Sequence, residues 1–233
     1  MGRMTIVKIA VDRETTKALR AAAALGPTEA LLIAEPFTAY LVTKAPDHVA
    51  HLKLGDVEEA EGDVYLKLDE VATLASAASR AVRMGKRGGD AVITLEAGEG
   101  MWHVRAGGLR MPFRAEAVGK EDVEVAQLPE DGFVMVPDVP LEDLRPDLRL
   151  WKRWGITRIR IVVRAGRLVL APQGARSYVV IEGSEEAEGE AAVTVPLPAL
   201  TALTYLKRPT LGVSAKYLKA IAGYITVVIA GTE

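Results

Sequence analysis

The sequence predicts an α+β protein of two similar domains, in which antiparallel sheets carry helices on one face. The first observation is a unit of one strand, one helix and three strands that occurs four times along the 233 residues. The second is that turns of hairpin length join successive strands, which favours antiparallel pairing over a parallel sheet. The third is an acidic, proline-containing stretch at the midpoint, residues 118–131. We expect this stretch to connect an N-terminal domain (1–117) to a C-terminal domain (132–233).

The first unit starts with the alternating stretch Thr5–Val11, which predicts a strand. Asp12 is a candidate N-cap for an Ala-rich helix over residues 13–26, which closes on Gly26. Turns that contain proline separate the strands that follow. These strands are predicted at Ala30–Ile33, Phe37–Thr43 and His48–Leu54.

The second unit repeats this order. Its first strand is predicted at Val64–Leu68, and Asp69 is the expected cap of a helix that runs to about Arg83 and ends at Gly85. Glycine-rich turns then separate three strands. They are predicted at Ala91–Leu95, Met101–Ala106 and Phe113–Ala117.

The third and fourth units follow the connector. The third has a strand at Phe133–Val136 and a helix within Pro140–Trp154, which Pro146 is expected to confine to the part after it. Its remaining strands are predicted at Ile156–Val163, Arg167–Ala171 and Ser177–Ile181. After an acidic loop over 183–190, the fourth unit has the predicted strand Ala192–Leu197 and a short helix at Ala199–Lys207. Its last strands are predicted at Thr210–Ala215, Leu218–Ala222 and Ile225–Ile229.

The composition limits the kinds of protein to consider. Hydrophobic residues make up 49% of the chain but aromatic residues only 5%, so the core is expected to consist of Ala, Val, Leu and Ile. The absence of cysteine excludes disulfides, thiol nucleophiles and Cys-ligated zinc or iron–sulfur sites. The N-terminus lacks a secretory apolar segment, and no apolar run approaches the ~18 residues of a membrane span. We therefore expect a cytoplasmic protein.

Lys and Arg recur on the predicted helices. On any one helix, such residues most often form a solvated surface. If equivalent helices of all four units lie on one side of the sheets, however, they form a basic surface in a chain whose net charge is only −2. Such a surface suits a polyanion bound through its phosphates without base reading. The cations are Arg13, Lys17, Arg20, Arg80, Arg83, Lys86, Arg87, Arg145, Arg149, Lys152, Arg153, Lys207 and Arg208.

Three short segments add a family resemblance to this pattern. Residues 45–54 place His48-Val49 in a strand of the first unit, and the connector contains Glu121-Asp122-Val123-Glu124 followed by Leu128-Pro129-Glu130. Ile225–Glu233 supply a last strand and a short tail. In order and spacing, these segments and the four units resemble the DNA sliding clamps of the proliferating cell nuclear antigen (PCNA) type of archaea and eukaryotes. The resemblance covers essentially the whole chain as a pattern.

The resemblance implies the DNA clamp fold, with two β-α-β-β-β units in each domain. It implies a ring of three chains, a homotrimer or heterotrimer, with sheets outside and the helix cations around duplex DNA. Subunits would join edge to edge, with Phe113–Ala117 and Ser177–Ile181 as candidate edge strands.

The implied function is that of a DNA sliding clamp or polymerase processivity factor in DNA replication and repair, nucleoid-associated. A DNA polymerase, clamp loader, nuclease or ligase would dock through a short peptide. The implied peptide pocket consists of His48, Val49, Ala126, Leu128, Ala230, Gly231 and Thr232.

The sequence departs from that family in several places. Gly231 stands where the family usually has proline, the net charge of −2 contrasts with often strongly acidic members, and the fourth helix is short and weakly basic. These departures leave open a subunit of a heteromeric ring, or a clamp-fold adaptor that binds proteins without encircling DNA. A basic nucleic-acid binder that does not oligomerise also stays open.

The sequence does not favour an enzyme. It lacks the phosphate-binding GxxxxGK[ST] motif, the GxSxG nucleophile motif and the zinc-binding HExxH motif. Asp47, His48 and His51 are the only metal-like cluster, and residues three apart on a strand point to opposite faces. We expect no catalytic activity, no cofactor and no metal. An unrelated two-domain α+β enzyme with an unrecognised site stays the alternative.

Overall fold

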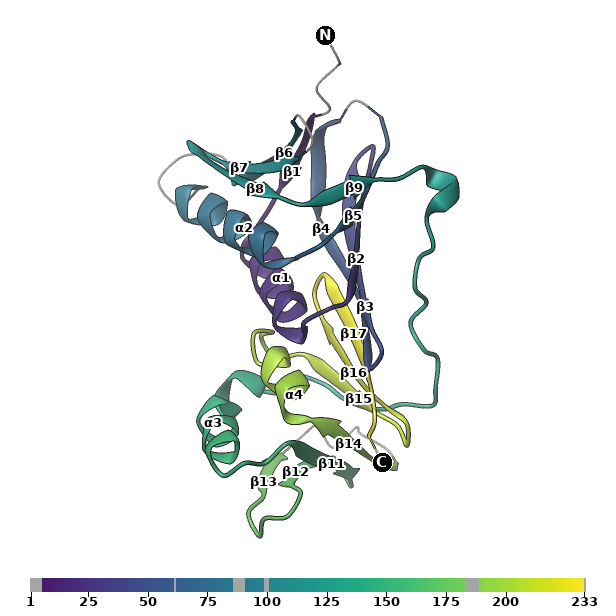
Figure 1. Cartoon of the computed structure of the whole chain (residues 1–233). Helices are drawn as coiled ribbons and strands as arrows, with labels where there is room; N and C mark the ends of the chain where they lie inside the picture. The colour runs from purple at the N-terminus through teal and green to yellow at the C-terminus, as the bar shows by residue number, and fades with distance from the viewer. Residues whose placement is uncertain (1–5, 61, 86–90, 99–100, 183–188, 233) are drawn as a thin grey trace. The chain divides into compact units, whose positions relative to one another are not determined.

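The computed structural model describes residues 6–60, 62–85, 91–98, 101–182 and 189–232 (Figure 1). The chain divides into two compact units. Unit 1 consists of Met1–Ala45 and Ala50–Gln127, and unit 2 of Pro46–Val49 and Leu128–Glu233. The division in the second half of the chain falls inside the expected connector, between Gln127 and Leu128.

Unit 1 contains the elements of the first two sequence units and the start of the connector. They are β1 (Ile6–Ala10), α1 (Arg13–Leu25), β2 (Glu29–Glu35), β3 (Thr38–Ala45), β4 (His48–Ala60), β5 (Val64–Leu68), α2 (Ala72–Gly85), β6 (Val92–Ala97), β7 (Trp102–Ala106), β8 (Leu109–Phe113), β9 (Ala115–Ala117) and the 3-10 turn η1 (Lys120–Asp122). The first two residues of β4 belong to unit 2.

The strands of unit 1 form one continuous path in the order β9-β5-β2-β3-β4-β1-β6-β7-β8. β1 pairs antiparallel with both β4 and β6. Helices α1 and α2 contact each other, and α2 also contacts β6, β7 and β8 (Figure 1). The buried side of the strands is aliphatic, as the composition predicts, with Ile9, Leu32 and Leu54 among the largest side chains.

Helix α1 follows the signals that predict it. The Asp12 carboxylate accepts a hydrogen bond from the Thr15 backbone N–H at 2.7 Å, which satisfies one free donor of the first turn. Gly26 ends the helix with a left-handed φ of 67°, a conformation that glycine adopts at little cost. Both predicted boundaries are confirmed.

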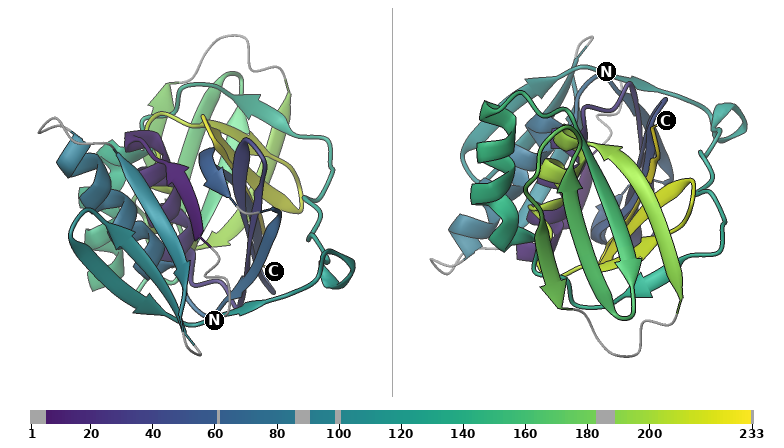
Figure 2. Two further views of the ribbon diagram at one scale, coloured as in Figure 1. Left: turned by 90° about the horizontal axis from the view of Figure 1, so that it is seen from above. Right: turned by 90° about the horizontal axis from the view of Figure 1, so that it is seen from below.

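Unit 2 contains the third and fourth sequence units. They are β10 (Val134–Val136), the 3-10 turn η2 (Leu141–Leu144), α3 (Arg145–Arg153), β11 (Arg158–Arg164), β12 (Arg167–Pro172), β13 (Val179–Glu182), β14 (Glu190–Pro196), α4 (Leu197–Leu203), β15 (Thr210–Val213), β16 (Tyr217–Ala222) and β17 (Ile225–Ala230). One sheet has the order β13-β12-β11-β14, and its strands lie side by side in Figure 2 (right). The other has the order β10-β15-β16-β17. The pairings within both sheets are antiparallel.

The two units share one topology. In unit 1 the segment β5-β2-β3-β4 corresponds to β14-β11-β12-β13 of unit 2, and β1-β6-β7-β8 corresponds to β10-β15-β16-β17. They differ in two places. β4 pairs with β1, whereas β13 has no described pairing with β10, and β5 carries the extra strand β9, which has no described counterpart on β14. The fold class is therefore confirmed: an α+β architecture in which each unit contains two β-α-β-β-β repeats.

Some predicted boundaries are wrong. The expected strand Phe113–Ala117 is two strands, because the chain leaves β7 at Phe113 and β9 then pairs with β5. Asp69 does not cap α2, because the helix begins three residues later, at Ala72. The backbone N–H of Asp69 donates instead to the Arg114 carbonyl.

The helices of unit 2 also differ from expectation. α3 begins at Arg145 with Pro146 in its first turn, where no intrahelical N–H donor is needed. α4 spans Leu197–Leu203 and ends before the predicted Lys207. Among the described residues, no helix is long and apolar enough to cross a membrane.

Candidate functional site

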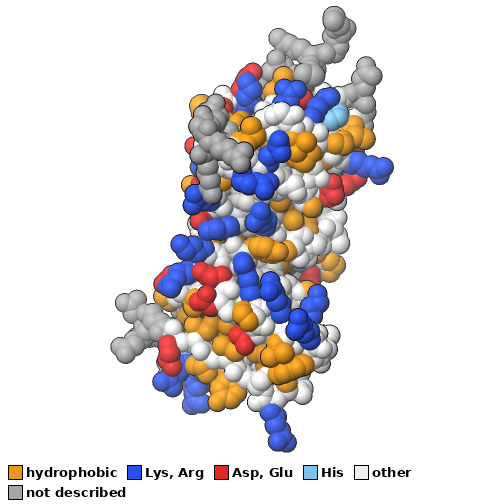
Figure 3. Space-filling model, turned by 90° about the vertical axis from the view of Figure 1, so that its left-hand side faces the viewer, with side chains coloured by type: hydrophobic (Ala, Val, Ile, Leu, Met, Phe, Trp, Pro, Cys, Tyr) orange, Lys and Arg blue, Asp and Glu red, His pale blue; other side chains and the backbone are white. Residues whose placement is uncertain are grey.

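Many Lys and Arg side chains lie on the face of the molecule shown in Figure 3. The helix cations of unit 1 differ in what they contact. Arg13 and Arg83 are exposed and form no ion pair with a described residue. Lys17 pairs with Glu14 at 2.9 Å along the same helix. Arg20 donates to the Ser79 hydroxyl at 3.1 Å, and Arg80 donates to the Ala106 carbonyl at 3.3 Å. The predicted site residues Lys86 and Arg87 lie outside the described residues.

Arg145 of unit 2 has a structural partner. Its guanidinium donates from Nη2 to the Thr204 carbonyl at 2.6 Å and from Nε to the Thr204 hydroxyl at 3.3 Å. It also lies 5.6 Å from the centre of the Tyr205 ring. Arg145 therefore joins α3 to the end of α4, where unpaired backbone carbonyls need donors.

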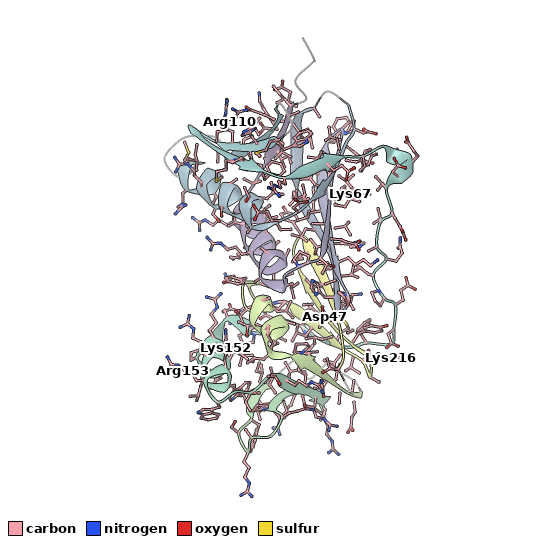
Figure 4. The ribbon with its side chains drawn as sticks, in the orientation of Figure 1. Asp47, Lys67, Arg110, Lys152, Arg153 and Lys216 are labelled. Carbon is pink, nitrogen blue, oxygen red and sulfur yellow. The ribbon has the colours of Figure 1, made fainter. Side chains whose placement is uncertain are left out.

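The remaining cations of α3 are free of such contacts. Arg149, Lys152 and Arg153 are exposed, and none forms an ion pair or hydrogen bond within the described chain; Lys152 and Arg153 are labelled in Figure 4. Lys207 is also exposed and unpaired among these residues. Arg208 instead binds Asp138 at 2.7 Å, and this hydrogen bond raises the pKa of Arg208.

Cations on the strands behave differently, because acidic side chains neutralise most of them. Buried Glu96 lies 3.3 Å from Arg105 and 3.4 Å from Arg110. Arg164 pairs with Glu190 at 2.8 Å, and Arg167 pairs with Glu182 at 3.0 Å. The unpaired positive charge of the described helices is therefore available to an external anion.

A second group of predicted site residues comes together within unit 2. His48 is buried, and its Nδ1 lies 2.8 Å from the Asp47 carboxylate, whereas its Nε2 has no hydrogen-bond partner among the described residues. The Ala230 N–H donates to the Asp47 carbonyl at 2.7 Å. Val49 is half-buried. The structure thus ties the His48-Val49 segment to the end of β17.

The tail after β17 is bound to β14 and to the residue that precedes β16 in unit 2. The Gly231 N–H donates to the Lys216 carbonyl at 2.6 Å, and the Thr232 N–H donates to the Thr194 carbonyl at 2.8 Å. A Cβ on Gly231 would lie only 2.8 Å from a Val193 methyl carbon. Proline, the usual family residue here, has no N–H for this hydrogen bond. Glycine at this position therefore allows the tail to lie close to β14 and to the start of β16.

A cavity of about 440 Å³ opens beside this tail. Three predicted site residues, Ala230, Gly231 and Thr232, form part of its wall. The rest of the wall consists of Arg160, Ala192, Val193, Thr194, Ala215, Lys216 and Tyr217. We call it the tail cavity.

The first part of the connector packs on unit 1. Val123 and Val125 cover a small apolar cluster of Leu31, Ile33 and Tyr65. His51 Nε2 lies 2.6 Å from the carbonyl oxygen of Ala126, a predicted site residue. The predicted site residue Leu128 is half-buried and belongs to unit 2. Sequence reasoning missed the role of His51, although its alternation with buried Ala50 and Leu52 places it on the outer side of β4.

Sequence reasoning also missed a groove of about 500 Å³ beneath this part of the connector. The outward residues of β2, β3 and β5 form its floor, with Lys67 labelled in Figure 4. Acidic side chains outnumber the two lysines on its walls. The charged lining residues are Glu29, Lys44, Lys67, Asp69, Glu116, Asp122 and Glu124.

The chemistry of a metal site is not assembled in the part of the chain described. There, no group of three or more His, Asp or Glu side chains is placed to hold a metal ion. The catalytic and cofactor expectations stay predictions.

Comparison with known proteins finds similarity in structure only. No protein-family model and no curated protein sequence match the chain. Among solved structures, PCNA from Entamoeba histolytica superimposes with a TM-score of 0.67 at 10% identity, over 98% of this chain and 99% of that one. The PCNA2–PCNA3 complex from Sulfolobus tokodaii gives a TM-score of 0.64 at 14% identity, over 97% and 98%.

A bacterial clamp is similar as well. The DNA polymerase III beta subunit from Thermotoga maritima gives a TM-score of 0.65 at 12% identity, over 97% of this chain and 65% of that one. These matches span nearly the whole chain in each case. Together with the repeated topology, they show that the chain has the fold of the PCNA-like DNA sliding clamps.

Proposed function

We propose that this protein is a DNA sliding clamp, a processivity factor that encircles duplex DNA and holds replication and repair proteins on it. The observation that carries the proposal is the set of exposed cations on helix α3 that have no described partner. Arg149, Lys152 and Arg153 are exposed without described partners, whereas the strand cations Arg164 and Arg167 bind carboxylates. A clamp needs free cations on the elements that face DNA, because these cations attract the phosphates.

The exposed cations suit a sliding contact. The flexible side chains of Lys and Arg attract the phosphate backbone of DNA without fixing a register. The attraction weakens as the salt concentration rises, because binding then gains less from the release of counterions. Arg13 and Arg83 of unit 1 and Lys207 of unit 2 are the other members of this unpaired set. Arg145 and Arg208 have internal partners and are not proposed as the main DNA contacts.

Ring closure is proposed to use two unlike edge strands, β8 and β13. Leu109 pairs with Ala106 across the two-residue Gly107-Gly108 turn. Because the backbone N–H and C=O groups of successive residues point alternately toward and away from the paired strand, those of Arg110 and Pro112 point away from β7. The β11–β12 hairpin fixes β13 in the same way, so that the backbone groups of Val180 and Glu182 point away from β12.

These two edges are complementary in one antiparallel register. In this register Arg110 of one copy lies opposite Glu182 of the next copy. Their side chains carry opposite charges, and their backbone groups exchange two hydrogen bonds. Pro112 then lies opposite Val180, where the proline carbonyl accepts one bond but offers no donor. This pairing would cover both edges, which otherwise stay open to unwanted association.

Partner docking is proposed at the segments that carry the remaining predicted residues: His48-Val49, the connector with Ala126 and Leu128, and the tail Ala230–Thr232. Within unit 2, the position of Ala230, Gly231 and Thr232 in the wall of the tail cavity supports it. Within unit 1, Ala126 lines the groove under the connector. The expected partners are a DNA polymerase, clamp loader, nuclease or ligase that presents an extended peptide with apolar anchors.

A subunit of a heteromeric ring is the second candidate, and Pro112 favours it. The proline removes one donor from the β8 edge, so a chain whose edge needs no donor at this position would complement β8 better than a second copy does. One similar structure is itself described as a complex of two different clamp chains, PCNA2 and PCNA3. An adaptor that binds proteins without encircling DNA would lack the salt-dependent DNA binding tested next.

Equilibrium binding of a fluorescein-labelled 30-base-pair duplex across a salt series tests the DNA contact. We expect wild-type affinity to fall steeply with salt, and the R149Q/R153Q variant to show a slope of log affinity against log salt that is shallower by about 2. The matched control is K8Q/R164Q, which removes the same charge from strand residues paired with Glu59 and Glu190 and should keep the wild-type slope. Equal loss in both variants would show that net charge, not the helices, governs binding.

A further inference from the structure

The tail cavity differs in charge from the groove under the connector. Arg160 lies on β11 opposite Thr194 of β14, and Lys216 precedes β16 beside the tail (Figure 4). Both side chains are exposed, and neither forms an ion pair with a described residue. Two cations that line one cavity without a neutralising partner provide a site for an anion.

No described acidic residue lines the tail cavity. Its other walls are small apolar side chains such as Ala192 and Ala230, two threonine hydroxyls and the Tyr217 side chain. On the same protein, five carboxylates line the groove under the connector. The positive lining is therefore a property of this cavity and not of the outer surface as a whole.

We propose that the tail cavity binds an aspartate or glutamate side chain of the docking peptide. The inference rests on the proposed docking function and adds to it the residue class that the peptide carries at this point. Arg160 and Lys216 would hold the carboxylate, and the small side chains around them leave room for the peptide backbone. The cavity volume of about 440 Å³ is within the range of small-ligand sites.

A peptide fits the surroundings better than a nucleic acid does. A phosphate backbone needs a row of cations, as on α3, whereas this cavity has only two. The tail cavity also continues the proposed docking surface within unit 2. Ala230 forms part of the cavity wall, and its backbone N–H donates to the carbonyl of Asp47, the residue before His48. A peptide that occupies that surface therefore reaches the cavity without a separate site.

The expected contribution is modest and sensitive to salt. The two cations are exposed, and ion pairs at exposed sites change affinity by about fivefold or less. Salt at 0.5 M screens such a contact strongly, since the Debye length falls well below 10 Å. A preference of this size favours acidic peptides over neutral ones, but it does not decide whether a peptide docks.

The test begins with selection of a random 16-residue phage-displayed peptide library on the immobilised full chain. We expect selected peptides to share apolar anchors and a fixed position enriched in Asp or Glu. The best binder and its Glu→Gln or Asp→Asn form are then synthesised with a fluorophore. Their affinities are measured against wild type, R160Q, K216Q, the double variant R160Q/K216Q and the control R176Q, which removes an exposed cation of unit 2 outside the cavity.

The acidic peptide should bind wild type and R176Q about fivefold more tightly than its neutral form, and this preference should vanish in R160Q/K216Q. The E233Q variant removes the side-chain charge of the residue after Thr232 and should keep or increase the preference. Selection of anchored peptides without an acidic position would overturn the proposal and leave docking intact. If no peptide is selected, both the docking function and this proposal fail.

Discussion

At the scale of single residues, Gly231 shows how one position adapts the tail to this chain. Its N–H binds the Lys216 carbonyl at 2.6 Å, and its missing Cβ leaves room for Val193. Both features disappear if the family's proline is introduced. The glycine is thus a local requirement of the tail as it lies here, not an incidental loss of the family residue.

The G231P variant should detach the tail from β14 and β16. The lost hydrogen bond and the contact with Val193 are expected to lower the free energy of unfolding by about 1–3 kcal/mol, measured by urea denaturation. The control is G132A, because a Cβ at Gly132 meets no atom within 4 Å and this position is not in the left-handed region. Unchanged stability in G231P would show that the tail does not depend on these contacts.

At the scale of elements, helix α3 combines two kinds of cation. Arg145 binds the end of α4 through Thr204, whereas Arg149 and Arg153 have no described partner. In the sequence, each is an arginine of the segment 140–154 that contains the predicted helix of the third unit. Only the position of Thr204, 59 residues further along, distinguishes their roles.

The R145A variant should therefore lose stability, and R149Q/R153Q should lose DNA affinity. Removal of the two Arg145 hydrogen bonds is expected to cost about 1 kcal/mol in unfolding free energy, because the side chain is exposed. Thermal denaturation of both variants, beside the duplex-binding assay, separates the effects. Loss of stability in R149Q/R153Q of the same size would contradict the assignment.

Local signals predicted the elements whose boundaries are local. Asp12 and Gly26 mark α1 correctly, because each acts on backbone groups of its own turn. The break between β8 and β9 was not predictable in this way, because it depends on β5, about fifty residues earlier in the chain. The contact between His51 and the Ala126 carbonyl, 75 residues apart, was missed for the same reason.

The candidate site was predictable to a similar extent. The pattern selected both His48 and Ala230, and the structure joins their segments through the Asp47 carbonyl. The groove beneath the connector was missed, because it combines the β2–β3 hairpin with β5 and with connector residues that lie more than seventy residues after the hairpin. Alternation identifies outward residues on each strand but does not show which strands become neighbours.

At the scale of the whole molecule, two units of the same topology present unlike free edges. β8 ends the strand path of unit 1, and β13 ends a sheet of unit 2. Joining unlike edges of successive copies is a heterologous contact, which closes into a ring when the rotation between copies permits. The proposed register makes Arg110 and Glu182 the charged pair of this contact.

A charge exchange tests that register. R110E should weaken assembly, because it places a like charge opposite Glu182 in the next copy, and E182R should do the same by facing Arg110. The double variant R110E/E182R restores an opposite pair and should recover assembly, as followed by sedimentation velocity. Failure of the double variant to recover, with both single variants folded by circular dichroism, would reject this pairing.

The most direct test of the clamp account is the mass of the wild-type chain in solution, measured by light scattering on a sizing column at low and moderate salt. The account predicts three copies of the 25.0 kDa chain, about 75 kDa, at both salt concentrations. A monomer throughout, at concentrations up to 100 μM, would contradict a self-assembling ring. The heteromeric ring would then be the form to test, by mixing with a second clamp chain.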